Sequence, residues 1–169
     1  MTHRPDPPAT AVAAPPGAVV PGFEFVCELN ARLEAPVVIG ATPEGYKRMV
    51  PIIGGRFEGP RLKGTGVPGG ADWQYQRSDG VWILEALYLL RTEDGAIIEV
   101  RNRGMRHGPP AVMQRLAAGE PVDPSEYYFR AAPSFQAPAG PYEWLNRGLF
   151  ISTGVRYPDA VKLWVYRVT

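Results

Sequence analysis

The stretch from Gly54 to Trp73 reads GGRFEGPRLKGTGVPGGADW and holds seven glycines and two prolines among aromatic and charged residues. Glycine at this density weakens a helix, and in a strand it marks bulges or places where another backbone comes close. The stretch therefore predicts a strongly bent β-ribbon. Bent ribbons are the means by which a sheet curls and closes on itself, so this segment decides the fold class.

The sequence on both sides predicts further strands. Apolar and polar residues alternate from Phe23 to Leu33, as a strand with one buried face requires. The runs 81–92 and 96–103 predict a hairpin joined by a turn at Thr92–Gly95. Three more β-rich runs follow: Tyr127–Ala132, Gly148–Arg156 and Val161–Val168. About eight strands in simple succession are typical of antiparallel barrels and sandwiches.

One segment, Pro109–Gly119, predicts a short helix. Prolines stand near its start, glycine ends it, and its apolar residues share one face at helical spacing. Two interpretations are open for this helix: a lid or plug between strands, or a surface connection with no further role.

Length and composition predict one domain. The chain has 169 residues, of which 45% are hydrophobic, enough for a single core. We expect a barrel domain over residues 22–169, preceded by a disordered or extended arm over the proline-rich residues 1–21. No run approaches the roughly 20 apolar residues that a membrane-spanning helix needs, so we expect no membrane association and a cytoplasmic protein.

The charge of the chain argues against nucleic acid as a partner, and its cysteine content excludes an internal disulfide. The net charge of +1, from 18 basic and 17 acidic residues spread along the chain, lacks the basic stripe of a nucleic-acid binder. Cys27 is the single cysteine, so no internal disulfide forms, and we interpret it as a buried apolar side chain.

No cofactor is predicted. The two histidines, His3 and His107, form no recognised zinc spacing with Cys27. The spacing of Gly64, Gly66 and Gly69 lacks the following helix of a phosphate-binding loop, so strand bending explains it better than nucleotide binding.

The ordered motifs of the chain carry a family resemblance. PIIGGRFEGPRLKG, PGGADW, LRTEDGAII, YYFRAAPSF, YEWLN and GLFISTGVR follow one another as in the bacterial and fungal family called domain of unknown function 3237. The resemblance covers Phe23–Thr169. It implies an all-β fold, an eight-stranded antiparallel meander β-barrel similar to that of allene oxide cyclase, with one short helix between strands. The activity of this family is not established, and similar barrels serve as cyclases, other isomerases or binding scaffolds.

A closed barrel of this size has an interior that is packed or holds one small ligand. We expect one pocket to gather charged and aromatic residues of the motifs. The candidate catalytic residues are Asp72, Arg130 and Asn146. The candidate ligand-binding residues are Arg56, Glu58, Arg61, Trp73, Tyr142, Trp144 and Arg156.

The candidate carboxyl groups have alternative interpretations. Asp72 is either a general acid or base with a pKa raised by burial, or a cap of the Gly69–Gly70 turn. Glu85 and Glu99 interrupt apolar strands and are either further acids or bases, or members of cross-strand ion pairs with Arg91 or Arg101.

The arginines and tryptophans are open to two interpretations as well. Arg130 and Arg156 either bind a ligand carboxylate or oxyanion, or form structural bridges to aspartate. Trp73 and Trp144 suit a flat ligand, but aromatic residues on strands commonly belong to a core.

Two functions are compatible with these residues. The first is a cofactor-independent isomerase, cyclase or lyase acting on a small cyclic or aromatic carbonyl compound. The second is a noncatalytic barrel that binds a small organic ligand. Strands that are apolar on both faces also indicate a possible homo-oligomer.

Overall fold

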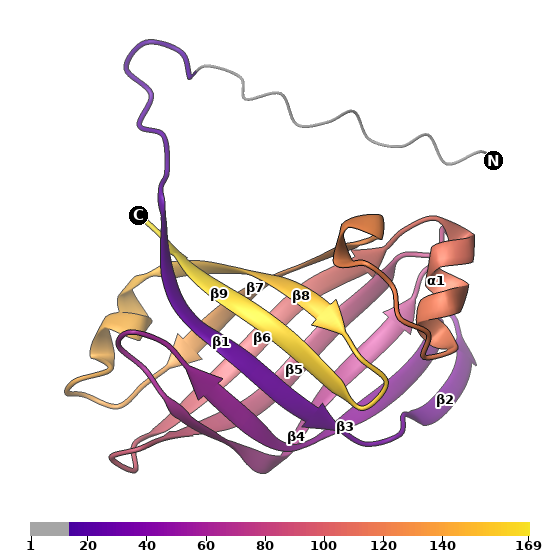
Figure 1. The fold of residues 1–169 in the computed structure, drawn as a ribbon, viewed down its shortest axis with the longest axis horizontal. Helices are drawn as coiled ribbons and strands as arrows, with labels where there is room; N and C mark the ends of the chain where they lie inside the picture. Colours follow the sequence, from indigo (N-terminus) through magenta and orange to yellow (C-terminus); the bar gives the residue numbers. More distant parts are fainter. Residues whose placement is uncertain (1–13) are drawn as a thin grey trace.

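The computed structural model describes residues 14–169, whose strands wrap into a closed antiparallel barrel (Figure 1). The strands are β1 (Phe23–Leu33), β2 (Val37–Thr42), β3 (Gly45–Glu58), β4 (Gly64–Gln76), β5 (Trp82–Thr92), β6 (Ile97–His107), β7 (Tyr128–Gln136), β8 (Leu149–Arg156) and β9 (Ala160–Val168). The helical segments are α1 (Pro110–Ala117) and two short 3₁₀ turns, η1 (Pro124–Glu126) and η2 (Glu143–Arg147).

The barrel closes because β1 pairs with β9 on one side and with β3 on the other. Eight strands, β1 and β3 to β9, form the ring, so the predicted eight-stranded antiparallel barrel with one short helix is confirmed. The short strand β2 was not predicted; it pairs with β3 and lies outside the ring. The strand before α1 also runs on to His107, four residues beyond the predicted Arg103.

Glycine permits the closure at the seam between β1 and β3. Gly55 pairs with Ala31 of β1 and has a φ of +145°, in the region that side chains disfavour. A Cβ atom at Gly55 would lie 2.1 Å from the carbonyl oxygen of Asn30. The glycine-rich stretch is therefore the bent part of the ribbon, shared between β3 and β4.

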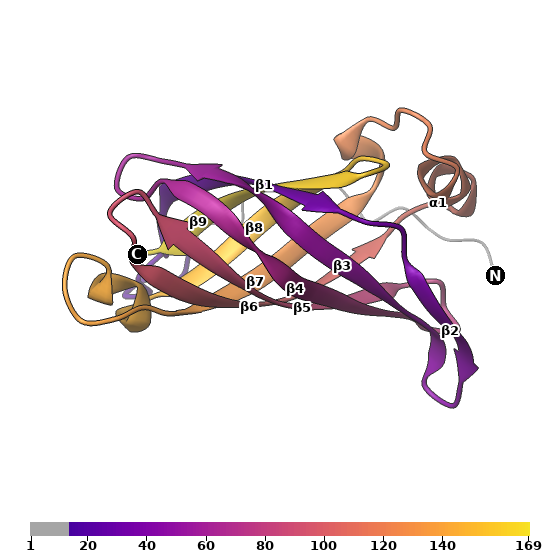
Figure 2. The same cartoon turned by 90° about the horizontal axis from the view of Figure 1, so that it is seen from below.

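The two ends of the barrel differ. Helix α1 lies at one end and the turn η2 at the other (Figure 2). Toward η2, large apolar side chains fill the interior, among them Phe57, Ile98, Phe135 and Phe150, each at most 6% exposed. Leu145 of η2 is 1% exposed and joins this core, so the η2 end is sealed by hydrocarbon.

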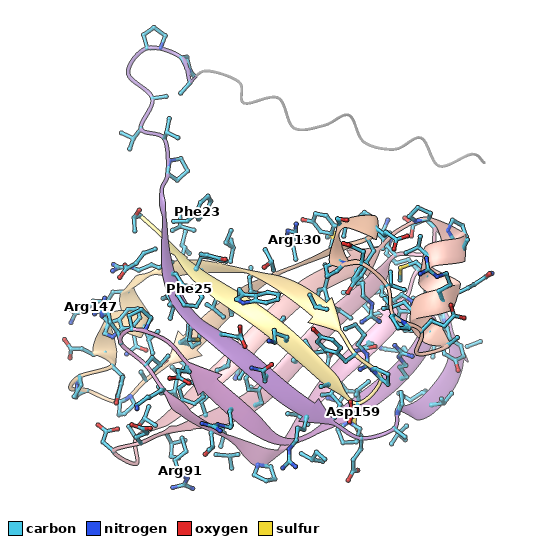
Figure 3. All side chains as sticks on the ribbon, in the orientation of Figure 1. Phe23, Phe25, Arg91, Arg130, Arg147 and Asp159 are labelled. Carbon is cyan, nitrogen blue, oxygen red and sulfur yellow. The ribbon has the colours of Figure 1, made fainter. Side chains whose placement is uncertain are left out.

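The outer surface carries both apolar and charged side chains. Figure 3 shows Phe23, Phe25, Arg91 and Arg130 on the outside of the ribbon. Leu149 is 78% exposed, and other large apolar residues of the outer face are partly exposed. The possible homo-oligomer remains a prediction.

The first strand is preceded by an N-terminal segment, of which residues 14–22 are described. Residues 14–22 are exposed, whereas residues 1–13 of the predicted arm lie outside the described residues, so the division into arm and barrel domain remains a prediction. Within the described residues, no helix combines the length and apolar character needed to cross a bilayer.

Candidate functional site

The half of the interior nearer α1 is lined by polar side chains as well as apolar ones. Asp72 and Gln74 of β4 and Asn102 and Arg106 of β6 alternate along their strands, and so point to the same face. These four residues line one cavity, together with Tyr88 and apolar residues of the surrounding strands. We call this cavity the polar lumen.

The register of β4 places Asp72 on the inward face, and the bulge before it leaves that face unchanged because it adds two residues, an even number. The register with β5 shifts between Val67 and Ala71, where β4 carries extra residues. Beyond the bulge Asp72 pairs with Ala86, which pairs in turn with Asn102 of β6, so the three form one row across the sheet. Trp73, the next residue, is therefore on the outer face and is 50% exposed.

The two oxygens of Asp72 have different surroundings. Oδ2 accepts a hydrogen bond of 2.5 Å from the Gln74 side-chain amide, and the Gln74 oxygen accepts one of 2.8 Å from Nε of Arg48. Oδ1 is shielded from solvent and has no hydrogen-bond partner among the described residues. Gln74 thus holds one oxygen, and no side chain of residues 14–169 holds the other.

Burial raises the pKa of Asp72 from 3.8 to about 6. Desolvation disfavours the carboxylate by more than the sum of the groups that favour it, which are the Gln74 side-chain amide, the charge of Arg106, the backbone of Glu85 and the charge of Arg48. Near neutral pH such a group can both accept and donate a proton, which is the property of a general acid or base.

Arg106 is the buried cation of the polar lumen. It is 4% exposed, its Nε has no hydrogen-bond acceptor among residues 14–169, and its guanidinium lies 5.7 Å from the centre of the Phe129 ring. Desolvation, together with repulsion from Arg48 and Arg156, lowers its pKa to about 10, so it remains charged at neutral pH. The Asn102 oxygen, also buried, is a third polar atom without a partner.

Unpartnered buried polar atoms are uncommon and call for an explanation, such as a bound ligand or water. Here Asp72 Oδ1, Asn102 Oδ1 and Arg106 Nε belong to residues that line the same cavity. The polar lumen has a volume of about 40 Å³, far below the roughly 300–1,000 Å³ of typical small-molecule pockets. It therefore suits one functional group of a ligand better than a whole ring.

A larger cavity lies at the α1 end, and we call it the mouth. Its volume is about 310 Å³, and Arg48, Arg106 and Arg156 line it with Trp82 and with Met113 and Leu116 of α1. Arg106 lines both the mouth and the polar lumen. A ligand of small-molecule size would fit the mouth, and Arg106 could contact it because this residue lines both cavities.

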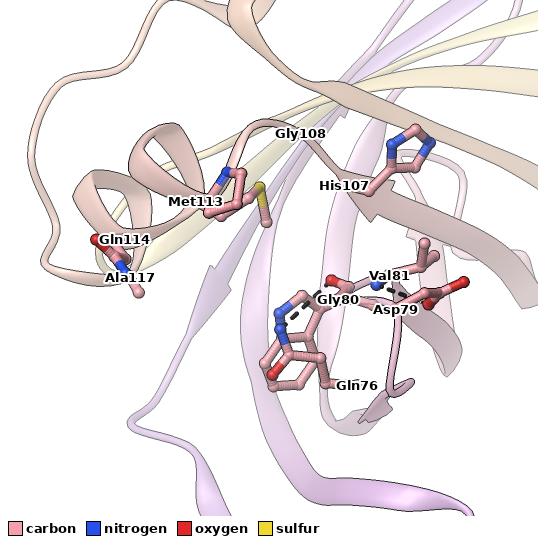
Figure 4. Close-up of a pocket in the computed structure, with 11 residues that line it drawn as sticks. Gln76, Asp79, Gly80, Val81, His107, Gly108, Met113, Gln114 and Ala117 are labelled. Atoms are coloured by element: carbon pink, nitrogen blue, oxygen red, sulfur yellow. Dashed lines mark hydrogen bonds between the residues drawn. The ribbon is translucent and has the colours of Figure 1, made fainter. Parts of the chain in front are cut away.

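A third cavity, of about 570 Å³, lies between α1 and the turn that joins β4 to β5. Figure 4 shows Met113 of α1 above this turn, where the Gln76 amide donates to the Gly80 carbonyl and Asp79 accepts from the Val81 backbone. Trp82 and Met113 line this cavity as well as the mouth. The helix therefore lies at the open end of the barrel and borders both cavities. The interpretation of this helix as a lid or plug remains a prediction.

The structure brings together only part of the predicted site. Asp72 lies in the polar lumen and Arg156 at the mouth. Trp73 and Arg130 are on the outer face, where the Arg130 side chain donates to the Phe129 carbonyl at 2.9 Å. Arg56 and Glu58 are exposed and line a groove outside the seam of β1 and β3.

The remaining candidates lie at the η2 end, far from the polar lumen. The guanidinium of Arg61 lies 4.0 Å from the centre of the Trp144 ring, and the Tyr142 hydroxyl donates to Asp94 at 2.9 Å. The Asn146 side chain bonds both the N–H and the carbonyl of Ala137. These contacts hold η2 in place and leave none of the four beside Asp72.

The alternatives for the other charged residues are also resolved by contacts. Glu99 pairs with Arg101 at 2.9 Å, and Glu85 pairs with Arg103 rather than with Arg91 or Arg101, at 2.8 Å. Arg156 bonds the carbonyl groups of Ala160 and Pro158 and forms no ion pair with an aspartate within the described chain. Within residues 14–169, no group of three His, Cys, Asp or Glu side chains could hold a metal ion.

Sequence reasoning missed Arg48, Gln74, Asn102 and Arg106. A signal existed for two of them, because Asn102 and Arg106 in the run RNRGMR over residues 101–106 are four residues apart and so share one face of a strand. Once the strand is extended to His107, Asn102 and Arg106 fall on the same face as the buried Val100, and Arg101 and Arg103 face outward.

Comparisons with known proteins agree with this architecture. The family described as "Protein of unknown function (DUF3237)" matches residues 21–168. A UPF0311 protein of Rhodopseudomonas palustris strain TIE-1 is 39% identical over 145 residues, which is 86% of this chain and 95% of that protein. A crystal structure of a conserved protein of unknown function from Rhodopseudomonas palustris has a TM-score of 0.87 at 36% identity, covering 90% of this chain and 100% of that one.

A more distant likeness is to the crystal structure of an enzyme from Penicillium herquei. Its TM-score is 0.66 at 21% identity, and the match covers 94% of this chain and 100% of that chain. At this identity the likeness shows the fold alone.

Proposed function

The chain belongs to the DUF3237 family of proteins of unknown function, and from that premise we propose that it is a cofactor-independent acid–base enzyme. The reaction would be an isomerisation, cyclisation or elimination of a small cyclic or aromatic carbonyl compound. The observation that carries the proposal is the Asp72 carboxyl group, with one oxygen held by Gln74, the other unpartnered, and a pKa of about 6.

Each group of the polar lumen has a role in this proposal. The Asp72 carboxylate removes a proton from the carbon next to the carbonyl group, and the electron pair of the broken C–H bond moves to the carbonyl oxygen. Arg106 stabilises the resulting oxyanion, because a buried cation without a protein acceptor offers its N–H groups to developing charge. The protonated Asp72 then returns the proton to another position of the substrate or to its leaving group.

The size of the two cavities restricts how a substrate lies. The polar lumen, at about 40 Å³, admits the reacting group, and the mouth, at about 310 Å³, holds the body of the molecule. Trp82, Met113 and Leu116 offer an apolar surface to that body. The fold of the Penicillium herquei enzyme supports the proposal only in that a similar barrel can serve an enzyme.

A noncatalytic ligand-binding barrel is the second candidate. The small volume of the polar lumen favours it, because a ligand that stays in the mouth would not bring a reactive carbon to Asp72. The same charged groups would then orient the ligand without transferring a proton.

Exchange of substrate protons with D2O, followed by NMR, tests the proposal on a panel of cyclic enones and phenolic ketones. We expect exchange at the carbon next to the carbonyl group, slower by a factor of about 10² or more in Asp72→Asn. The matched control is Glu85→Gln, which changes a carboxylate on the outer face. Binding that survives in Asp72→Asn with no exchange in either protein would support the noncatalytic barrel and contradict the enzyme.

A further inference from the structure

Three arginines converge on the mouth, and none of them forms an ion pair with a carboxylate among the described residues. Arg48, Arg106 and Arg156 all line it, and repulsion from Arg48 lowers the pKa of both of the others. Asp159 attracts the charge of Arg156 without forming an ion pair with it. Asp72, the acidic group of the adjoining polar lumen, attracts all three arginines but is itself partly protonated near neutral pH. Like charges that line one cavity repel each other, and an anion bound between them would reduce that cost in free energy.

The donors of these arginines are only partly used by the protein. Arg48 donates Nε–H to Gln74 and stacks on Trp82 with its guanidinium carbon 4.1 Å from the ring centre. Arg156 donates to two backbone carbonyl groups at 2.9 and 3.0 Å. Arg106 has its Nε unpartnered, as described above. A guanidinium carries five N–H groups, so donors remain for an oxyanion at the mouth.

The rest of the mouth is apolar, which restricts the kind of anion. Trp82, Met113, Leu116 and Pro158 line it beside the arginines. A hydrated inorganic ion would leave this surface unused, whereas a carboxylate on an apolar skeleton would fill it and present two oxygens to a guanidinium fork.

We propose that the ligand of this barrel is a small organic acid, whose carboxylate is bound by Arg48, Arg106 and Arg156 and whose alicyclic or aromatic body packs between α1 and Trp82. The inference names the substrate class for the function proposed above, on which it rests for the reaction, whereas binding of the acid stands by itself. The carboxylate at the mouth would fix the molecule so that its carbonyl end enters the polar lumen.

The test compares 3-oxocyclohexane-1-carboxylate with its carboxamide, which has the same skeleton without the charge. Calorimetry on the unmodified protein at pH 7.5 should show the acid binding at least about tenfold more tightly than the amide. Arg106→Met should weaken the acid by about thirtyfold or more and leave the amide unaffected, whereas Arg103→Met, on the outer face, should change neither. Equal binding of acid and amide, or inorganic phosphate binding as tightly as the acid, would overturn the inference.

Thermal melting separates a binding role for Arg106 from a structural one. At pH 5, where Asp72 is largely protonated, Arg106→Met should raise the melting temperature of the free protein, because it removes a buried cation repelled by its neighbours. A marked fall would identify Arg106 as a structural residue and contradict the proposal. Failure of Arg106→Met to fold would likewise identify Arg106 as a structural residue and contradict the proposal.

Proton exchange distinguishes this inference from the proposed function. If the acid binds tightly in a way that depends on Arg106 but its ring protons do not exchange, the acid-binding site is supported and the proposed enzyme is contradicted. Exchange that is equally fast for acid and amide would leave the enzyme standing and reject the acid site.

Discussion

Replacing Asp72 by asparagine should make the protein more stable at neutral pH, although it removes a group that we place at the centre of the reaction. Asparagine keeps an oxygen for the Gln74 amide and has no charge to desolvate. The pKa of Asp72 rises from 3.8 to about 6 on folding. At 1.36 kcal/mol per pH unit this difference corresponds to about 3 kcal/mol.

The direction follows from proton binding. Between pH 3.8 and about 6 the unfolded carboxyl group has lost its proton while the folded one keeps it, so unfolding releases a proton. The free energy of unfolding of the unmodified protein should therefore fall as the pH rises through this window, and remain level above it. Asp72→Asn lacks this contribution, so its advantage should grow from pH 4 to pH 7.5 by about 2–3 kcal/mol.

Urea denaturation of both proteins from pH 4 to pH 8 measures this difference, because the other titrating groups contribute alike to the two profiles and cancel. Glu85→Gln, whose carboxylate pairs with Arg103 on the outer face, should show no such pH-dependent advantage. Parallel profiles for the unmodified protein and Asp72→Asn would refute the argument that burial keeps this group protonated.

Three further changes test other parts of the structure. Gln74→Leu removes the hydrogen bond that lowers the pKa of Asp72, so that pKa should rise above its value of about 6, as a ¹³C NMR titration of the carboxyl group would show; an unchanged midpoint would mean that Gln74 does not hold Oδ2. Leu145→Ala, in the core at the η2 end, should lower the free energy of unfolding by about 2–5 kcal/mol in urea, and a loss well below 1 kcal/mol would contradict the sealed end. Gly55→Ala should destabilise by about 1–3 kcal/mol more than Gly95→Ala in the same assay, since both glycines have positive φ but only Gly55 faces a backbone oxygen at 2.1 Å.

Much of the fold could be predicted from the sequence because its signals are local. The alternation from Phe23 to Leu33 gave β1 with its observed bounds, and the apolar run before Thr92 gave the hairpin of β5 and β6. The density of glycines in β3 and β4 predicted that the ribbon bends there. The strand β2 escaped prediction because VVIGAT pairs with β3 alone and has no buried residue, so no apolar alternation marks it.

The site was harder to predict because it depends on register. The choice between Asp72 and Trp73 as the inward residue depends on the register of β4 with its neighbouring strands, and the irregular pairing between Val67 and Ala71 hides that register from the sequence. Arg61, Tyr142, Trp144 and Asn146 looked suited to a ligand because they are polar or aromatic within distinctive motifs. Their contacts in the structure fasten the turn η2 onto the barrel.

Because the η2 end is filled by apolar side chains, the interior of the barrel is closed at that end. Leu145 and the phenylalanines around it block passage there, so a molecule that reaches Asp72 from the mouth must leave by the way it came. Substrate and product would then use the same opening, the mouth beside α1, and a new substrate could enter only after the product had left. The turnover rate would therefore depend on the side chains of Met113 and Leu116, which line the mouth but take no part in proton transfer.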